Sequence, residues 1–187
     1  MNARQVSVGV SLAVLVAACG DQVPPPPTTP TTTPSANPGT ARIDPAAVKA
    51  LRDLVLPDLD GKPQPLSQWK GRILVVNYWA TWCAPCKEEM PAFSQLHQQY
   101  AAKGVQFVGI SIDSVEKVKQ FQISTPVAYP LLIGTMQTMQ GAVGLGNAIQ
   151  GLPFTVVLDR RGEVYSTKLG RFDEKILEQR LKDLLRD

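Results

Sequence analysis

The sequence predicts an α/β fold in which a mixed central sheet has helices on both faces. Two apolar runs, Ile73–Trp79 and residues 105–110, are rich in β-branched side chains, as is typical of buried strands. Helical periodicity follows the first run from Lys87 onward. Near the C-terminus, two further strands and a helix follow one another, which adds an antiparallel pair to the sheet.

Turn and capping residues predict the elements between these runs. The Asp-Gly-Lys sequence at 60–62 indicates a turn between apolar residues 54–56 and Leu66. After the 105–110 strand, either Asp113 or Ser114 can cap a helix. No internal repeat is visible.

The C-terminal elements have equally clear signals. Residues 155–158 and Val164–Leu169 predict two strands joined by a turn at 159–163, and therefore an antiparallel pair. Asp173 is placed to cap a final helix. That helix carries one apolar stripe: Ile176, Leu177, Leu181, Leu184 and Leu185.

The most informative motif is a pair of cysteines, Cys83 and Cys86, at the junction of the first strand and its helix. Two thiols at this spacing can close into a disulfide and reopen without unfolding the chain. The helix N-terminus stabilises a thiolate, so we expect Cys83 to be the attacking nucleophile. Cys86, one turn deeper, would resolve the mixed disulfide. Pro85 lacks an N–H at a position where the helix offers it no partner.

These residues carry a resemblance to a known family. The run VNYWATWCAPC at 76–86 resembles the active-site segment of the thioredoxin superfamily. Glu89, Pro91 and the Gly-Leu-Pro sequence at 151–153 are similar to motifs of its TlpA and ResA branch, which are membrane-anchored, extracytoplasmic thiol-disulfide oxidoreductases. The resemblance implies a thioredoxin-like sandwich with an N-terminal hairpin extension. It also implies a short strand and helix within 129–141.

The resemblance implies a proton acceptor for the second thiol. Glu89 lies three residues after Cys86, on the same face of the helix, and matches a glutamate of this branch. A partly desolvated carboxylate has a raised pKa and can take the Cys86 proton. In thioredoxin itself an aspartate stands six residues before the first cysteine, where this chain has Asn77.

The resemblance further implies a substrate-binding surface. Pro153 occupies the position of a cis-proline, so we expect a cis Leu152-Pro153 bond. Phe154 either selects apolar substrate segments or fills the core. Trp79 should be buried and Trp82 exposed. The predicted substrate-binding residues are Trp82, Pro85, Leu152 and Pro153.

The N-terminal region resembles a bacterial lipoprotein signal. Arg4 precedes an apolar run of 13 residues at 6–18, shorter than the about 20 that a membrane-spanning helix needs. Cleavage of residues 1–18 would leave Cys19 as a lipidated N-terminus, whereas an ordinary secretory signal cut at the same place is the alternative. Residues 19–45 then form a Pro/Thr-rich stalk. The thioredoxin-like domain follows at 46–187.

The charge pattern argues against several classes of partner. Of the 19 basic residues one leaves with the signal, so 18 oppose 16 acidic residues and the net charge falls from +3 to +2. No basic run is interleaved with aromatic residues. The sequence therefore favours neither nucleic-acid binding nor electrostatic adhesion to a membrane.

Two other functions use the same cysteines. A copper chaperone could bind its metal through Cys83, Cys86 and either Met136 or Met139. His97 is eleven residues after Cys86, about 16 Å along a helix, so it cannot join such a shell.

A peroxiredoxin-like antioxidant peroxidase is the other alternative. It would need a Thr-x-x-Cys pattern, but Thr81 is only two residues before Cys83. A whole-domain comparison could still return that group's label.

The prediction is therefore a monomeric, lipid-anchored extracytoplasmic disulfide reductase that uses no cofactor and no metal. Its partners would be disulfide-containing exported proteins and a membrane electron donor of the thiol-reducing transporter type. The resemblance suggests cytochrome c or copper-enzyme assembly as the pathway. Which membrane holds the anchor is left open by the sequence.

Overall fold

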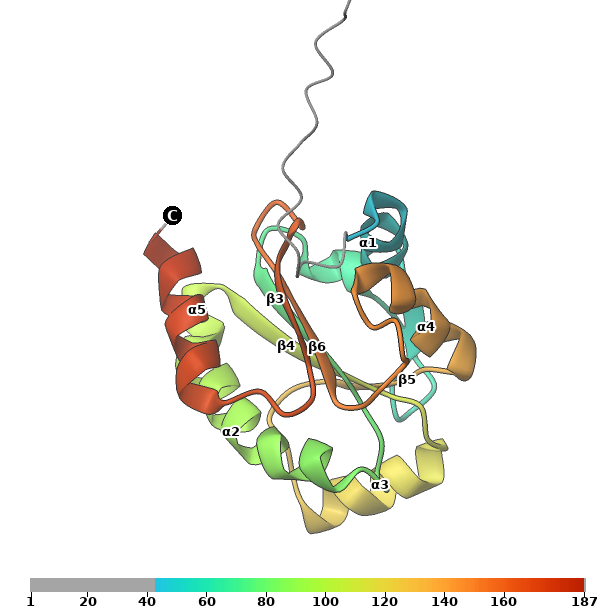
Figure 1. Cartoon of the computed structure of the whole chain (residues 1–187). Coiled ribbons are helices and arrows are strands. Elements are labelled where there is room, and N and C mark those ends of the chain that lie inside the picture. The colour runs from blue at the N-terminus through green and yellow to red at the C-terminus, as the bar shows by residue number, and fades with distance from the viewer. Residues whose placement is uncertain (1–42, 187) are drawn as a thin grey trace, which may run out of the picture. The chain divides into compact units, whose positions relative to one another are not determined.

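The centre of the structure is one five-stranded mixed sheet (Figure 1). The structure is a computed structural model that describes residues 43–186. In sheet order the strands are β5 (Leu131–Ile133), β4 (Val105–Ser111), β3 (Ile73–Trp79), β6 (Phe154–Leu158) and β7 (Val164–Leu169). β3 pairs in parallel with β4 and antiparallel with β6, and β6 pairs antiparallel with β7. The predicted mixed sheet is confirmed.

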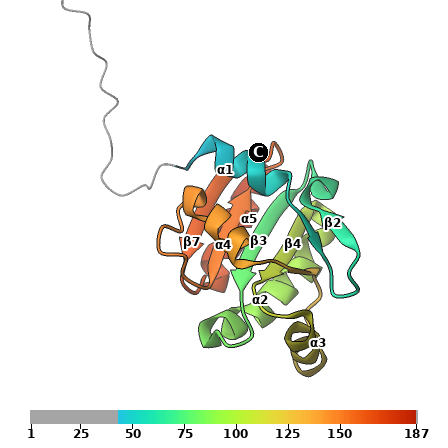
Figure 2. The ribbon, with the colours of Figure 1, turned by 90° about the vertical axis from the view of Figure 1, so that its right-hand side faces the viewer.

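Alternation along β3 divides the core into two layers, as the pleat of a strand requires. Val75 and Trp79 pack with α2 (Ala84–Tyr100), α3 (Val115–Ser124) and α5 (Glu174–Arg186). Val76 and Tyr78 pack with α1 (Pro45–Arg52) and α4 (Met136–Gly141). Figure 2 looks onto the face that α1 and α4 cover. Helices therefore lie on both faces, as expected.

The predicted N-terminal hairpin is present as β1 (Val55–Pro57) paired antiparallel with β2 (Pro63–Pro65). Asp58 closes its turn because one carboxylate oxygen accepts hydrogen bonds from the backbone N–H groups of Asp60 and Lys62. Gly61 adopts φ 78°, a conformation that glycine reaches at little cost.

Helix α1 before the hairpin was not predicted. It begins at Pro45, the last residue that the sequence analysis assigned to the stalk, and Asp44 caps it by accepting a hydrogen bond from the Ala46 N–H. Val48 and Leu51 bury its inner face. The predicted signal, Cys19 and most of the stalk lie outside the described residues.

Two helix caps test the sequence predictions. Asp173 caps α5 as predicted and accepts hydrogen bonds from the backbone of Lys175 and Ile176. Within the apolar stripe of α5, however, Ile176 is exposed, so only part of the stripe meets the core. Ser114 stands at the N-cap of α3 without a side-chain capping bond. Among the helices of residues 43–186, none is both long and apolar enough to span a membrane.

We expect the contact between α1 and Gly144 to be intolerant of added volume. A Cβ atom on Gly144 would lie 2.6 Å from the Ala47 Cβ, so Gly144→Ala should lower the free energy of unfolding by about 1–3 kcal/mol. Gly141→Ala is the matched control, because a Cβ there meets nothing within 4 Å and alanine favours a helix. Urea denaturation of both variants checks this; equal midpoints would contradict it.

Candidate active site

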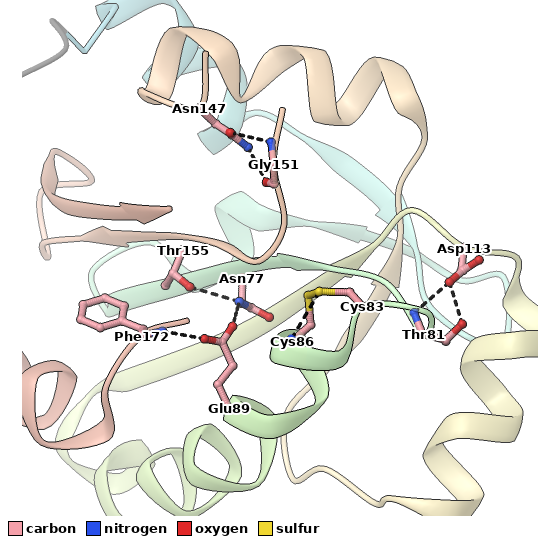
Figure 3. Close-up of a disulfide and its surroundings, with 10 residues drawn as sticks. All are labelled: Asn77, Thr81, Cys83, Cys86, Glu89, Asp113, Asn147, Gly151, Thr155 and Phe172. Carbon is pink, nitrogen blue, oxygen red and sulfur yellow. Dashed lines mark hydrogen bonds between the residues drawn. A yellow bond between two sulfur atoms is a disulfide. The ribbon is translucent and has the colours of Figure 1, made fainter. Parts of the chain in front are cut away.

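Cys83 and Cys86 form a disulfide at the N-terminus of α2 (Figure 3). Cys83 is the N-cap residue, and its sulfur accepts a hydrogen bond of 3.3 Å from the Cys86 backbone N–H. Cys83 is 5% exposed and Cys86 is fully buried, so the second sulfur is the more shielded, as predicted. A donor directed at the first sulfur favours a thiolate there once the disulfide opens. Pro85 lies in the first turn, also as predicted.

The loop between β3 and α2 is held by Asp113. The backbone N–H and the hydroxyl of Thr81 both donate to its carboxylate, at 2.8 and 2.7 Å. Burial acts to raise the pKa of Asp113, but the Thr81 hydrogen bonds and nearby Lys117 hold it below its ordinary value. Of the two predicted capping candidates, Ser114 takes the N-cap position of α3, and the Asp113 carboxylate instead anchors the cysteine loop.

Glu89 is a buried carboxylate, 2% exposed, on the inner face of α2. One oxygen accepts a hydrogen bond of 2.8 Å from the Asn77 side chain, and the other accepts one of 2.8 Å from the Phe172 backbone N–H. Burial raises the pKa of Glu89 to about 7, although both hydrogen bonds and the charge of Arg171 act to lower it. The burial from which the raised pKa was predicted is confirmed.

Asn77 connects Glu89 to the sheet. Its side-chain amide donates to Glu89 and also to the Thr155 hydroxyl on β6, at 3.1 Å. From the sequence, this asparagine was evident only as the replacement of an aspartate. Its partners could not be inferred, because Thr155 is 78 residues away along the chain.

The Leu152-Pro153 bond is cis, as predicted. The loop before it is fixed by Asn147, whose buried side chain accepts from the Gly151 N–H at 2.9 Å and donates to the Gly151 carbonyl at 3.0 Å. No motif in the sequence indicated these two hydrogen bonds. Phe154 is buried and packs against the Tyr78 ring, so it fills the core and does not face a substrate.

Exposed apolar side chains occur on two loops of the site. Trp82, directly before Cys83, is 66% exposed, whereas Trp79 is buried; both placements were predicted. Ile149, on the loop before the cis bond, is also exposed. Leu152 is half-buried and Pro153 is buried.

The structure does not support the copper alternative. Met139 packs in the layer of α1 and α4, whereas Cys83 and Cys86 pack in the layer of α2 and α5. Met136 is exposed. Within residues 43–186 no group of three or more His, Cys, Asp or Glu side chains could hold a metal ion. His97 is half-buried, with ring contacts to Phe107 and Tyr129.

Comparison with known proteins gives consistent results. The model of the AhpC/TSA family matches residues 48–167. The thiol-disulfide oxidoreductase ResA of Bacillus thuringiensis is 32% identical over 137 residues, covering 73% of this chain and 77% of the relative. The thioredoxin-like protein YneN of Bacillus subtilis is 32% identical over 133 residues, covering 69% and 75%. A thiol:disulfide interchange protein of the thioredoxin family from Chlorobium tepidum superposes with a TM-score of 0.65 at 29% identity, covering 71% and 92%.

We expect Glu89 to make stability depend on pH. The folded protein holds the Glu89 proton more tightly than the unfolded chain, since burial raises this pKa from 4.5 to about 7. Stability from this group is therefore complete below about pH 4.5 and is lost as the pH rises to about 7, a loss of about 3 kcal/mol. Glu89→Gln should remove that loss.

The measurement is the free energy of unfolding of the wild type and the variant between about pH 4 and pH 8. The difference between them should change by about 3 kcal/mol in favour of the variant as the pH rises. Glu88→Gln changes the exposed neighbour and serves as the control. A difference for Glu89→Gln that does not vary with pH would show that folding does not raise the pKa of Glu89.

Proposed function

Because the chain belongs to the AhpC/TSA family and is a thiol-disulfide oxidoreductase of the ResA type, we propose that it is a lipid-anchored extracytoplasmic reductase that uses Cys83 and Cys86. The observation that carries the proposal is the disulfide at the N-terminus of α2, with a backbone N–H on the Cys83 sulfur. Glu89, buried one turn further along α2, supports a proton-transfer role beside the second sulfur.

The proposed reaction has two exchange steps. The Cys83 thiolate attacks one sulfur of the substrate disulfide, forms a mixed disulfide and releases the other substrate sulfur as a thiolate, which takes a proton from water. Cys86 then gives its proton to the Glu89 carboxylate and attacks the Cys83 sulfur. The remaining substrate sulfur leaves and takes up a proton. The substrate thus gains two electrons and two protons, and the enzyme returns to the disulfide form.

The peroxidase alternative gains no support from the site. Its Thr-x-x-Cys pattern is missing, and the hydroxyl of Thr81 is already bonded to the Asp113 carboxylate at 2.7 Å. The match to the AhpC/TSA family model does not favour the peroxidase, because this match was expected even for a chain without the Thr-x-x-Cys pattern. A dithiol reductase needs no further group in the site than those present.

The direction of electron flow is part of the proposal and is tested by the reduction potential. We expect the purified protein, equilibrated with dithiothreitol or glutathione buffers, to have a potential near that of thioredoxin, about −270 mV. Such a value would require an external dithiol donor, which we propose to lie in the membrane. A potential near about −120 mV would identify a disulfide donor and would overturn the direction.

The substrate is proposed to be an exported protein that carries a disulfide, from cytochrome c or copper-enzyme assembly. Cys86→Ser should accumulate a mixed disulfide between Cys83 and this substrate, because the resolving thiol is missing. Cys83→Ser, the matched control, should trap nothing. Mass spectrometry of the mixed disulfides trapped in cell envelopes should identify the substrate protein. A structure of that complex should place the substrate against Trp82, Pro85, Leu152 and Pro153. Equal trapping by both variants would contradict the assignment of Cys83.

The anchor is proposed from the sequence of the first 45 residues. Cleavage after residue 18 and lipidation of Cys19 would attach the domain to a membrane through the stalk. Mass spectrometry of the protein extracted from membranes should find an N-terminal Cys19 with acyl chains. Cys19→Ala should release the protein from the membrane fraction. An unmodified N-terminus at residue 19 would indicate an ordinary secretory signal.

A further inference from the structure

Asn77 carries a buried oxygen that the oxidised protein leaves without a hydrogen bond. The residue is 1% exposed, and its amide nitrogen donates to both Glu89 and Thr155. When Glu89 is ionised, its carboxylate can only accept, so the bond from Asn77 places the amide nitrogen on this side and Oδ1 on the other. No donor within residues 43–186 reaches its Oδ1 atom, which in Figure 3 points to the side on which the disulfide lies.

A buried carbonyl oxygen without a donor costs free energy, and folded proteins keep few of them. The disulfide cannot supply a donor, because neither sulfur carries a hydrogen. Reduction changes this, since Cys86 becomes a thiol, and a thiol S–H is a weak donor. Cys86 is fully buried, so water does not compete freely for that hydrogen.

The surroundings of the two sulfurs are therefore complementary. The Cys83 sulfur faces a donor, the Cys86 backbone N–H, which favours a thiolate. Asn77, whose unpartnered Oδ1 points toward the disulfide in Figure 3, offers an acceptor, which favours a thiol. Such an arrangement keeps the attacking sulfur charged and the resolving sulfur neutral until the mixed disulfide has formed.

We propose that Asn77 is a positioning residue whose Oδ1 accepts a hydrogen bond from the Cys86 S–H in the reduced protein, while its amide nitrogen holds the Glu89 carboxylate. This inference rests on the proposed function, in which Cys86 resolves the mixed disulfide. When a dithiol reduces the protein, the S–S bond breaks and the two sulfurs take up two electrons. Cys86 takes up one proton and Cys83 stays a thiolate, while the second proton of the reductant passes to water and the reductant closes into a disulfide. When Cys86 later attacks Cys83, its proton passes to Glu89.

A purely structural role for Asn77 would have a different signature. The amide also joins β3, α2 and β6, so its removal destabilises the fold in any case. A brace of this kind acts equally in the oxidised and reduced proteins. The hydrogen bond proposed here exists only in the reduced protein, so it shifts the equilibrium between the two forms.

The test compares Asn77→Leu with Thr155→Val, which removes the other partner of the amide and leaves Oδ1 in place. Each full-length variant is equilibrated with dithiothreitol buffers, and the reduced fraction is counted after alkylation. We expect Asn77→Leu to shift the equilibrium about tenfold toward the disulfide and Thr155→Val to stay within about twofold of the wild type. An unchanged equilibrium in Asn77→Leu, or an equal shift in both variants, would overturn the inference.

A second measurement needs no variant that could fail to fold. A crystal structure of the reduced wild-type protein should place the Cys86 sulfur within hydrogen-bonding distance of the Asn77 Oδ1. If the Asn77 Oδ1 of the reduced protein instead accepts a hydrogen bond from water or from another side chain, the proposal is rejected. Titration of the wild type distinguishes failure of the proposed function from failure of the role of Asn77. If dithiothreitol does not reduce the wild-type disulfide reversibly, both fail. An unchanged equilibrium in Asn77→Leu rejects only the role of Asn77.

Discussion

The site depends on one buried carboxylate and the two donors that hold it. Glu89 joins the inner face of α2 to β3 through Asn77 and to the segment just before α5 through the Phe172 backbone. A carboxylate at this depth is costly, and its hydrogen bonds offset only part of that cost, which is why its pKa stays high. These three parts of the fold are thus joined by a group whose charge can change near neutral pH.

The parallel pairing of β3 and β4 supplies the second constraint. Because the carboxyl ends of neighbouring parallel strands meet at the same edge, the residues that follow them are close in space. Thr81 follows β3 and Asp113 follows β4, and they meet through two hydrogen bonds. Asp113, which follows β4, therefore holds the loop that carries the cysteines. Glu89 holds α2, the helix that follows this loop, against β3.

Local patterns predicted the parts of the fold that depend on neighbouring residues. The strand before Cys83, the helix after it, the hairpin turn at 60–62 and the Asp173 cap all carry signals within a few positions of the sequence. The Asn147 clamp, the Thr81 and Asp113 pair and the Phe172 contact do not, because each joins backbone or side chains that only the folded chain brings together. Helix α1 was not predicted, because it is short and because Pro45, its first residue, resembles the prolines of the stalk.

The loop at 151–153 has few free main-chain groups. The N–H and carbonyl of Gly151 are bonded to Asn147, and the Pro153 carbonyl accepts from the Gly170 N–H at 2.8 Å. Within residues 43–186, only the backbone of Leu152 is left unbonded in this stretch. An incoming polypeptide could therefore form at most a very short ladder here. Under the proposed function, selection of substrates would rest on side-chain contacts with Trp82 and Ile149 more than on main-chain hydrogen bonds.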